Sequence, residues 1–223
     1  MRRKTGGKSV FKKVWYFIWE DDSILSWVVN IILAYLLIKF IVYPGLGLVL
    51  GTTHPVVAVV SGSMEHCLRN NMICGQLPPQ YVNSYDAWWD TCGSFYSKYN
   101  ISKTDFNDYP FKNGFNTGDL MILVGKEPEK LNKGDVIVFL ANRPDPIIHR
   151  IIEKREVDGK YYFETKGDHN SNIGDVDKNI SEDNIIGKAL IRVPLLGYIK
   201  IGFVKLLDIM GIYNPLVRYG VFS

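Results

Sequence analysis

Cysteine is scarce in this sequence, and several other common signals are missing from it. Three cysteines in 223 residues are too few for a disulfide-rich scaffold, and the spacing of Cys67 and Cys74 is not that of a zinc site. The net charge of +3, from 26 basic and 23 acidic residues, does not predict a nucleic-acid-binding protein. The chain has no tandem repeat, and with 47% hydrophobic residues it is too apolar to be disordered.

One long hydrophobic segment lies near the N-terminus. Residues 23–51 contain a single charged side chain, Lys39, and 24–43 is about 20 residues long, or about 30 Å as a helix. This length matches the hydrocarbon layer of a bilayer, and Pro44 follows as a helix stop. The sequence therefore predicts a transmembrane anchor at 23–45, in preference to a buried core helix or a cleaved signal peptide.

Charged residues before this segment predict its orientation. Six basic residues precede it: Arg2, Arg3, Lys4, Lys8, Lys12 and Lys13. By the positive-inside rule, 1–22 lies in the cytoplasm and the chain after about Thr52 lies outside a cytoplasmic membrane that it crosses once. Two sequons, at Asn100 and Asn179, agree with an exterior location. In that more oxidising space, a disulfide among the three cysteines and free thiols are both compatible with the sequence.

After the anchor, the pattern changes to short β-like runs rich in Val, Ile and Tyr. They occur at 56–60, 119–124, 135–140, 147–152, 161–165 and 187–193. Asp158-Gly159 predicts a hairpin between two of them, and no helix of twelve or more residues alternates with the strands. The predicted fold class is mainly β: an N-terminal transmembrane helix plus an antiparallel β domain made of 52–64 and 118–200.

Two further segments flank or interrupt this β domain. Residues 65–117 are polar, rich in aromatics and too long for a bare loop, and short helices at 86–99 and 102–108 make them a small helical insertion. Its aromatic side chains either form a core of their own or contact lipid or substrate. The C-terminal stretch 201–223 is apolar but charged, which predicts an amphipathic segment on the membrane surface or against the β domain.

A serine and a histidine are the first two candidate catalytic residues. The run at 56–60 is followed by Ser61, Gly62 and Ser63, where glycine lets a substrate carbonyl approach closely and a serine hydroxyl is exposed. His149 stands in an apolar strand and needs a partner for its ring, for which an exposed serine is one candidate. A plain turn and a core histidine bonded to a carbonyl are the competing interpretations.

A third group could come from the acidic loop that follows 161–165. Asp168, Asp175 and Asp177 each offer a carboxylate that would hold an imidazole in one tautomer. A solvated turn explains the same residues. A calcium loop is disfavoured, because Asn179 stands where a bidentate Glu is required.

Five motifs occur in order along the chain: Ser-Gly-Ser-Met-Glu, Gly-Asp-Leu-Met-Ile-Leu, Lys-Gly-Asp-Val-Ile-Val-Phe, Pro-Ile-Ile-His-Arg-Ile-Ile and Thr-Lys-Gly-Asp-His-Asn. Together they resemble the type I signal peptidases of the archaeal and endoplasmic-reticulum branch, over the anchor and nearly all of 52–200. The resemblance implies Ser63 as nucleophile and His149 as general base. It also implies an oxyanion site made by the Ser63 amide with the Ser61 hydroxyl, and neither a cofactor nor a metal.

The acidic loop departs from the pattern of this family. The family places a second aspartate about six residues after the first, but Gly174 stands six residues after Asp168. We expect Asp175 to orient His149, with Asp168 in support and Asp177 as the alternative. The long insertion is expected of archaeal members of the family.

The resemblance implies a membrane-bound serine endopeptidase that removes signal peptides from exported preproteins. Its partners would be preprotein signal peptides and the lipid bilayer, with the protein-translocation channel as a further candidate and no nucleic acid. The alternative is a catalytically silent subunit that binds signal sequences in a translocation or processing complex. An autoproteolytic regulator with a serine–lysine dyad is opposed by the anchor and by His149, which stands where lysine would be needed.

Overall fold

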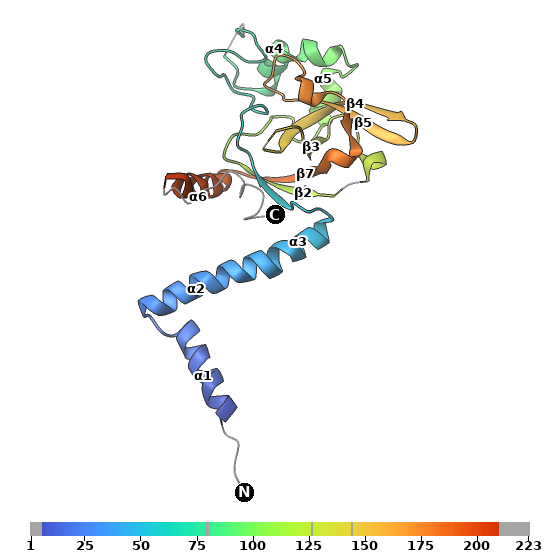
Figure 1. Cartoon of the computed structure of the whole chain (residues 1–223). Coiled ribbons are helices and arrows are strands. Elements are labelled where there is room, and N and C mark those ends of the chain that lie inside the picture. The colour runs from blue at the N-terminus through green and yellow to red at the C-terminus, as the bar shows by residue number, and fades with distance from the viewer. Residues whose placement is uncertain (1–5, 79–80, 126, 144, 210–223) are drawn as a thin grey trace. The chain divides into compact units, whose positions relative to one another are not determined.

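The computed structural model describes residues 6–78, 81–125, 127–143 and 145–209 (Figure 1). The chain divides into two units, 1–46 and 47–223, and each is described by itself. The second unit contains the sheet and every candidate catalytic residue.

The N-terminal unit is helical. Helix α1 spans Gly6–Trp19 and α2 spans Ile24–Leu37, and two polar side chains of α2 tie them together. The Ser26 hydroxyl donates to the carbonyl of Phe17, and the Asn30 amide donates to that of Ile18. These bonds satisfy polar groups that would otherwise be unpaired on an apolar helix.

The hydrophobic helix is longer than the sequence predicts. A π-helical turn, Ile38–Val42, and helix α3, Tyr43–Leu50, continue α2, so the expectation that Pro44 ends the helix is wrong. The Tyr43 N–H bonds to the carbonyl five residues back, and this widened turn makes room for a proline ring. Ile24–Leu50 is the one segment in the described part of the chain that is long and apolar enough to cross a membrane, which fits a single-pass anchor.

Seven antiparallel strands form one curled sheet in the order β1-β2-β7-β3-β4-β5-β6. Their bounds are β1 Val56–Ala58, β2 Leu120–Val124, β3 Val136–Phe139, β4 Ile147–Val157, β5 Lys160–Lys166, β6 Ile180–Ser181 and β7 Ile185–Val193. The predicted antiparallel β fold is confirmed. Strand β6 was not expected, because two residues are too short to show an alternating pattern.

Local sequence explains the turns and short helices between the strands. Asp158 and Gly159 both adopt positive φ, 52° and 76°, and Val157 pairs with Lys160, so the predicted hairpin closes in a two-residue turn. Single 3₁₀ turns follow β2, β5 and β6: η2 Pro128–Lys130, η3 Asp175–Asp177 and η4 Glu182–Asn184. Strand β3 is buried along its whole length because a separate apolar cluster packs on each of its faces.

The insertion contains two helices, α4 Tyr85–Ser97 and α5 Lys103–Asp108, capped by Ser84 and Ser102. Its aromatic side chains form a core of their own, as one of the two interpretations predicted, around Trp88, Tyr96 and Phe106. The core also includes Ile152 of β4, so the insertion packs on the sheet. Two of the three cysteines, Cys74 and Cys92, form a disulfide, and Cys67 is free and exposed.

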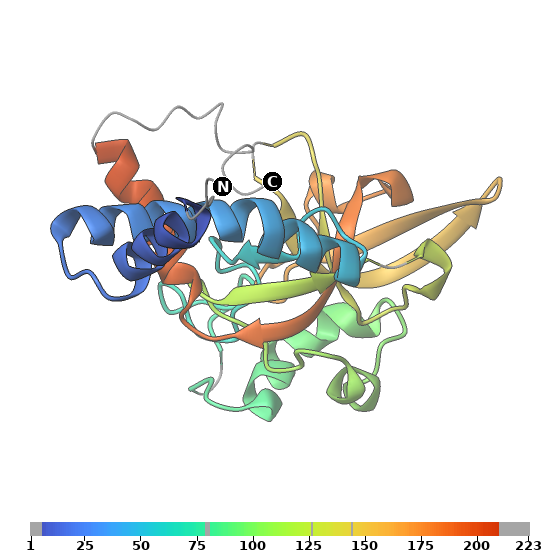
Figure 2. The same ribbon diagram turned by 90° about the horizontal axis from the view of Figure 1, so that it is seen from below.

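Helix α6, Gly197–Ile209, lies beside β1 in the C-terminal part of the chain (Figures 1 and 2). A Cβ at Gly118 would lie 2.0 Å from the Tyr198 ring, which shows how closely the start of α6 packs on the entry to β2. This contact is made by Tyr198, which precedes the predicted segment 201–223. Residues 210–223 of the predicted segment 201–223 lie outside the described residues.

Candidate active site

The proposed nucleophile lies just after β1, where the chain leaves the packed core. Ser63 is half-buried and Ser61 is exposed, and their hydroxyl oxygens are 3.2 Å apart, within hydrogen-bonding distance. Met64, which follows, is buried in the core of the sheet. The serine is therefore held by the core and still faces solvent.

Glu65 holds the chain in place on the C-terminal side of Ser63. Its buried carboxylate accepts hydrogen bonds from the Thr117 amide and hydroxyl, both at 2.9 Å, and from Arg69 Nε at 2.8 Å. Burial would raise the pKa of Glu65, but these bonds lower it below its ordinary value. The ionised carboxylate thus ties the chain after Ser63 to the loop that precedes β2.

His149 lies on β4 with 6% of its surface exposed and pairs with Ile137 of β3. Its Nδ1 contacts Asp177 Oδ1. The same carboxylate accepts bonds from the Thr165 hydroxyl at 2.7 Å and the Gly174 amide at 3.1 Å. Burial would raise the pKa of Asp177, but its bonds with His149 and Thr165 lower it. Because an ionised carboxylate can only accept, Nδ1 donates to Asp177, and Nε2 is the ring nitrogen left for another partner.

Gly167 shows where the serine segment and the histidine meet. A Cβ built on Gly167 would lie 2.8 Å from His149 Nε2 and 2.8 Å from the carbonyl oxygen of Ser63. His149 Nε2 and the serine segment therefore converge on one glycine. In the described part of the chain, the hydrogen-bond partner of the Ser63 hydroxyl is Ser61, not His149.

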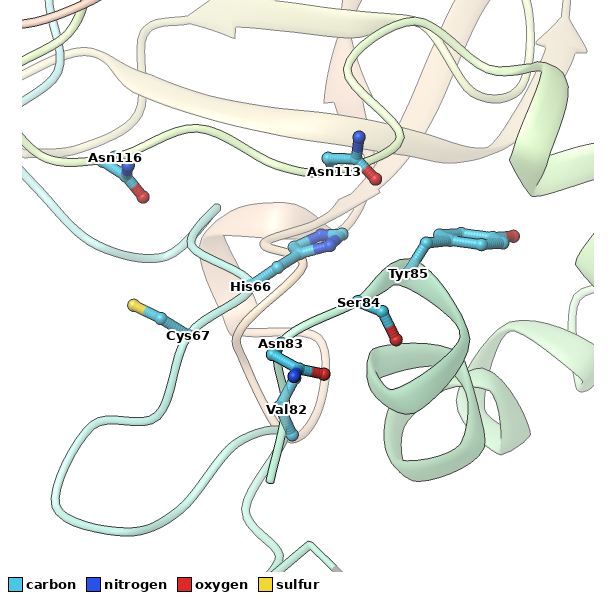
Figure 3. Close-up of a pocket in the computed structure, with 8 residues that line it drawn as sticks. All are labelled: His66, Cys67, Val82, Asn83, Ser84, Tyr85, Asn113 and Asn116. Carbon is cyan, nitrogen blue, oxygen red and sulfur yellow. The ribbon is translucent and has the colours of Figure 1, made fainter. Parts of the chain in front are cut away.

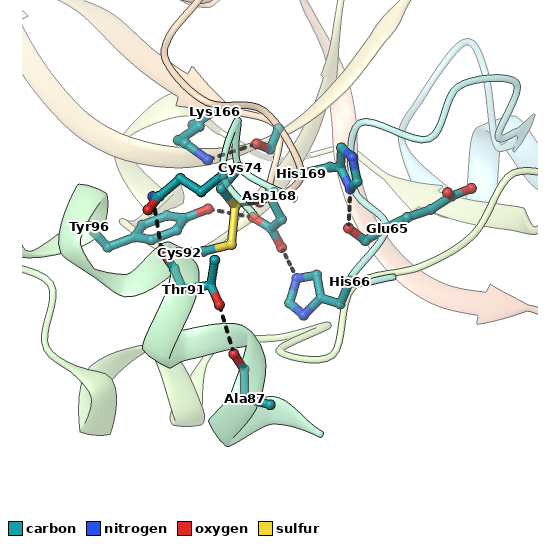
Figure 4. The surroundings of a disulfide bond; sticks show 12 residues. Glu65, His66, Cys74, Ala87, Thr91, Cys92, Tyr96, Lys166, Asp168 and His169 are labelled. Carbon is teal, nitrogen blue, oxygen red and sulfur yellow. Dashed lines mark hydrogen bonds and ion pairs between the residues drawn. A yellow bond between two sulfur atoms is a disulfide. The ribbon is translucent and has the colours of Figure 1, made fainter. Parts of the chain in front are cut away.

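Asp168 is fully buried and lies at the centre of a polar network (Figure 4). Arg150 binds both of its oxygens, Nε at 3.0 Å and Nη2 at 2.7 Å. The Tyr96 hydroxyl donates at 2.8 Å, and His66 Nε2 lies 3.0 Å away. Burial would raise the pKa of Asp168, but the Arg150 charge and the bond with His66 hold it well below its ordinary value. Asp168 thus joins strand β4 to the insertion and does not contact His149.

The structure separates the three candidate carboxylates. The Asp175 side chain is fully exposed and pairs with Lys178 at 3.0 Å. The expectation that Asp175 lies against His149 is therefore not met, and Asp177 occupies that place. The reason is the 3₁₀ turn Asp175–Asp177, which directs its first side chain to solvent and folds its last back onto the Gly174 amide.

Sequence reasoning missed two residues of the buried network, His66 and Lys166. The His66 ring stacks on Trp88 with ring centroids 3.9 Å apart and contacts Asp168. Lys166 is fully buried, donates to the Gly167 carbonyl and lies over the rings of Phe95 and Tyr96. Burial lowers the pKa of Lys166 to about 8. A signal for Lys166 was present, because it adjoins Gly167 in a motif used for the resemblance.

A pocket of about 380 Å³ opens beside His66, and all of its lining residues belong to the insertion (Figure 3). Its lining is mostly polar and comes from the segment after Ser63, the start of α4 and the loop before β2: His66, Cys67, Val82, Asn83, Ser84, Tyr85, Asn113 and Asn116. Figure 3 shows Asn83, Asn113 and Asn116 on different sides of the His66 imidazole.

We expect Asp168→Asn to lower the free energy of unfolding by about 3–5 kcal/mol at pH 7, because Arg150 would keep a buried charge without its partner. The pKa of Asp168 is depressed in the folded protein. The ionised carboxylate therefore contributes fully to the free energy of unfolding at pH values above its unfolded-state pKa of about 3.9. This contribution is lost progressively as the pH falls below that value toward the folded-state pKa. Denaturant unfolding from pH 7 to pH 3 measures this. The difference in the free energy of unfolding between wild type and variant should become smaller below about pH 4. A difference that stays constant would contradict the conclusion that Asp168 is ionised in the folded protein. Asp183→Asn, at an exposed ion pair with Lys160, is the control.

The sequence of the chain is similar to that of known proteins over part of its length. No protein-family profile matches the chain. Signal peptidase complex catalytic subunit sec11 of Dictyostelium discoideum is 37% identical over 95 residues, which are 39% of this chain and 52% of the relative. Signal peptidase complex catalytic subunit SEC11C of Homo sapiens is 31% identical over 122 residues, 47% of this chain and 62% of the relative. The SEC11 subunit of Lachancea thermotolerans is 35% identical over 98 residues, 39% and 56% of the two chains.

The chain spans about half to three-fifths of the length of these curated relatives. All three come from eukaryotes, so they do not support the archaeal part of the expectation. The resemblance to type I signal peptidases of the endoplasmic-reticulum branch, inferred from the motifs, is confirmed: the chain is similar in sequence to the catalytic subunits of the signal peptidase complex.

Proposed function

We propose that this chain is a membrane-anchored serine endopeptidase that removes signal peptides from preproteins. The observation that carries the proposal is the convergence of the Ser63 segment and His149 Nε2 on Gly167, with Asp177 on the opposite nitrogen of the ring. Similarity to signal peptidase catalytic subunits supports the same chemistry. A catalytically silent subunit would be expected to lack or misplace one of these groups, and that alternative is disfavoured.

In the mechanism, the Ser63 hydroxyl attacks the scissile carbonyl and His149 Nε2 takes its proton. The protonated ring then gives this proton to the leaving amine, and an acyl-enzyme on Ser63 remains. Water, deprotonated by the same nitrogen, releases the signal peptide. Asp177 holds the proton on Nδ1 throughout and stabilises the charged ring, without itself becoming protonated.

The segment around the nucleophile would stabilise the oxyanion. The Ser63 amide and the Ser61 hydroxyl are the proposed donors, each worth roughly 3 kcal/mol in the transition state. In the free protein, Ser61 is bonded to the nucleophile itself. Substrate binding would exchange this bond, so that the Ser63 hydroxyl turns to His149 and the Ser61 hydroxyl becomes free for the substrate oxygen.

The anchor would hold this chemistry at a membrane surface, where signal peptides emerge, and so raise the effective substrate concentration. We propose that 1–22 is cytoplasmic and that the unit after about Thr52 is on the opposite side, because the basic residues precede the span. Asn100 and Asn179 are both exposed, as glycosylation would require. Preprotein signal peptides and the bilayer are the proposed partners, with the translocation channel as a further one.

We expect Ser63→Ala, His149→Gln and Asp177→Asn each to lower kcat for preprotein cleavage by about 10³–10⁴-fold, because each removes one member of a group that acts as a unit. Purified full-length protein in detergent, incubated with a radiolabelled preprotein, provides the measurement. Asp175→Asn is the matched control, because it makes the same chemical change on an exposed side chain two residues away. Cleavage by Ser63→Ala at the wild-type rate would contradict the protease proposal. Loss of activity in Asp175→Asn, with Asp177→Asn still active, would show that Asp175 and not Asp177 orients His149.

Gly167→Ala should lower kcat by about 10²-fold, because its methyl group would press on His149 Nε2 and on the backbone of Ser63. The control is Gly202→Ala, whose methyl group would meet no atom within 4 Å. Thermal unfolding of both variants shows whether they remain folded at the assay temperature. A folded Gly167→Ala with unchanged kcat would show that Ser63 and His149 do not work together at this glycine.

In sealed microsomes containing the full chain, added protease should remove only an N-terminal epitope tag and leave the unit after the anchor intact, because the positive flank stays on the cytoplasmic side. Immunoblotting of both ends measures this, with detergent-opened vesicles as the control. Digestion of the β domain in closed vesicles would reverse the proposed orientation.

A further inference from the structure

The insertion contacts the loop that brings Ser63 and His149 together. This loop, residues 167–170, is called the site loop below. The amide of Cys74 donates to the carbonyl of His169 at 3.0 Å, and the amide of His169 donates to the carbonyl of Ser63 at 2.8 Å. The His169 peptide group therefore lies between the insertion and the nucleophile segment.

A second contact comes from helix α4. The hydroxyl of Tyr96 donates to Asp168 Oδ1 at 2.8 Å, and both side chains are completely buried. Burial raises the pKa of Tyr96 well above its ordinary value, so the hydroxyl keeps its proton and remains a donor. Figure 4 shows this tyrosine and the disulfide on the same side of Asp168.

The disulfide between Cys74 and Cys92 links these two contacts. Cys92 lies on α4 one turn before Tyr96, and Cys74 is the residue bonded to His169. One covalent bond therefore connects the two points from which the insertion holds the site loop. Around it, Trp88 and Phe106 give α4 a packed core of its own, so the helix is a rigid support.

We propose that the insertion is a positioning element for catalysis, in which Tyr96 and the Cys74–Cys92 bridge hold the site loop where Gly167 meets Ser63 and His149. This proposal rests on the proposed protease function. Residues 167–174 contain no strand or helix, so their place depends on such contacts. A displacement of about 1 Å in a catalytic group can cost about 10²-fold in rate, so a loop that lost one support would slow the chemistry without loss of the fold.

The chain offers a matched pair of tyrosines for the test. Tyr85 belongs to the same aromatic cluster as Tyr96, but its hydroxyl donates to the carbonyl of Lys103, inside the insertion, at 2.7 Å. We expect Tyr96→Phe to lower kcat about tenfold with little change in KM, and Tyr85→Phe to leave both constants near wild type. Both variants are assayed as full-length protein well below their thermal midpoints, so that a smaller folded fraction cannot explain the difference.

A spectroscopic measurement tests the positioning role without any substrate. The ¹⁵N signals of the His149 ring, assigned by their loss in His149→Gln, should shift in Tyr96→Phe and remain in place in Tyr85→Phe. A tyrosine that only stabilised the insertion would not move them.

The cysteines provide a second matched comparison. The double variant Cys74→Ser/Cys92→Ser should show the same loss of kcat and the same displaced His149 signals as Tyr96→Phe. Cys67→Ser, which removes the free and exposed thiol, should behave as wild type. Equal kinetics and unchanged ring signals in Tyr96→Phe and in the double cysteine variant would overturn the proposal.

The two proposals fail in different ways. If wild-type protein cleaves no preprotein, the protease function is wrong, but the His149 signals still report whether the insertion positions the site loop. If wild type cleaves and the matched variants are indistinguishable from their controls, the function stands and the positioning role is wrong.

Discussion

Alternation of side chains along β4 is the constraint on which the site depends. Neighbouring residues of a strand point to opposite faces, so His149 and Arg150 face opposite sides of the sheet. Thr165 of β5 lies on the His149 side and Lys166 on the Arg150 side, as the pairing of Arg150 with Lys166 requires. One face of the sheet thus carries the imidazole of His149. The other face carries the cationic side chains of Arg150 and Lys166, which contact the insertion.

The loop after β5 supplies one carboxylate to each face, and the surroundings of each decide its role. Asp168 meets a permanent cation, a tyrosine hydroxyl and a neutral imidazole in a dry interior, so it stays ionised and holds the structure together. Asp177 meets Thr165, the Gly174 amide and His149 at the edge of the site. There the carboxylate contacts Nδ1 of the ring and leaves its other nitrogen directed to the Gly167 side.

The sequence indicated much of this arrangement, and what it missed has physical causes. Hydrophobic runs and the Asp158-Gly159 turn are local signals, and they gave the strands and hairpin. Three aspartates in one irregular loop look alike in sequence, however, and the 3₁₀ turn that exposes Asp175 and buries Asp177 depends on a bond to Gly174. The prediction that Pro44 ends the helix was wrong for a similar reason. The π-helical turn before Pro44, which accommodates the proline ring, cannot be recognised from the composition of the segment. The role of His66 depends on Asp168, 102 residues away, which no local pattern records.

The proposed nucleophile lies where the packed interior ends, and this place reconciles two opposed requirements. A protease needs a serine that substrates can reach, yet its oxygen must be held to a fraction of an ångström. Here the residues that follow it, Met64 and Glu65, are buried, and its carbonyl is bonded to the site loop. The half-buried Ser63 is therefore held in place by buried neighbours and by the site loop. The proposed mechanism would thus depend on order that the core and the insertion supply, while the Ser63 side chain keeps part of its surface open to solvent.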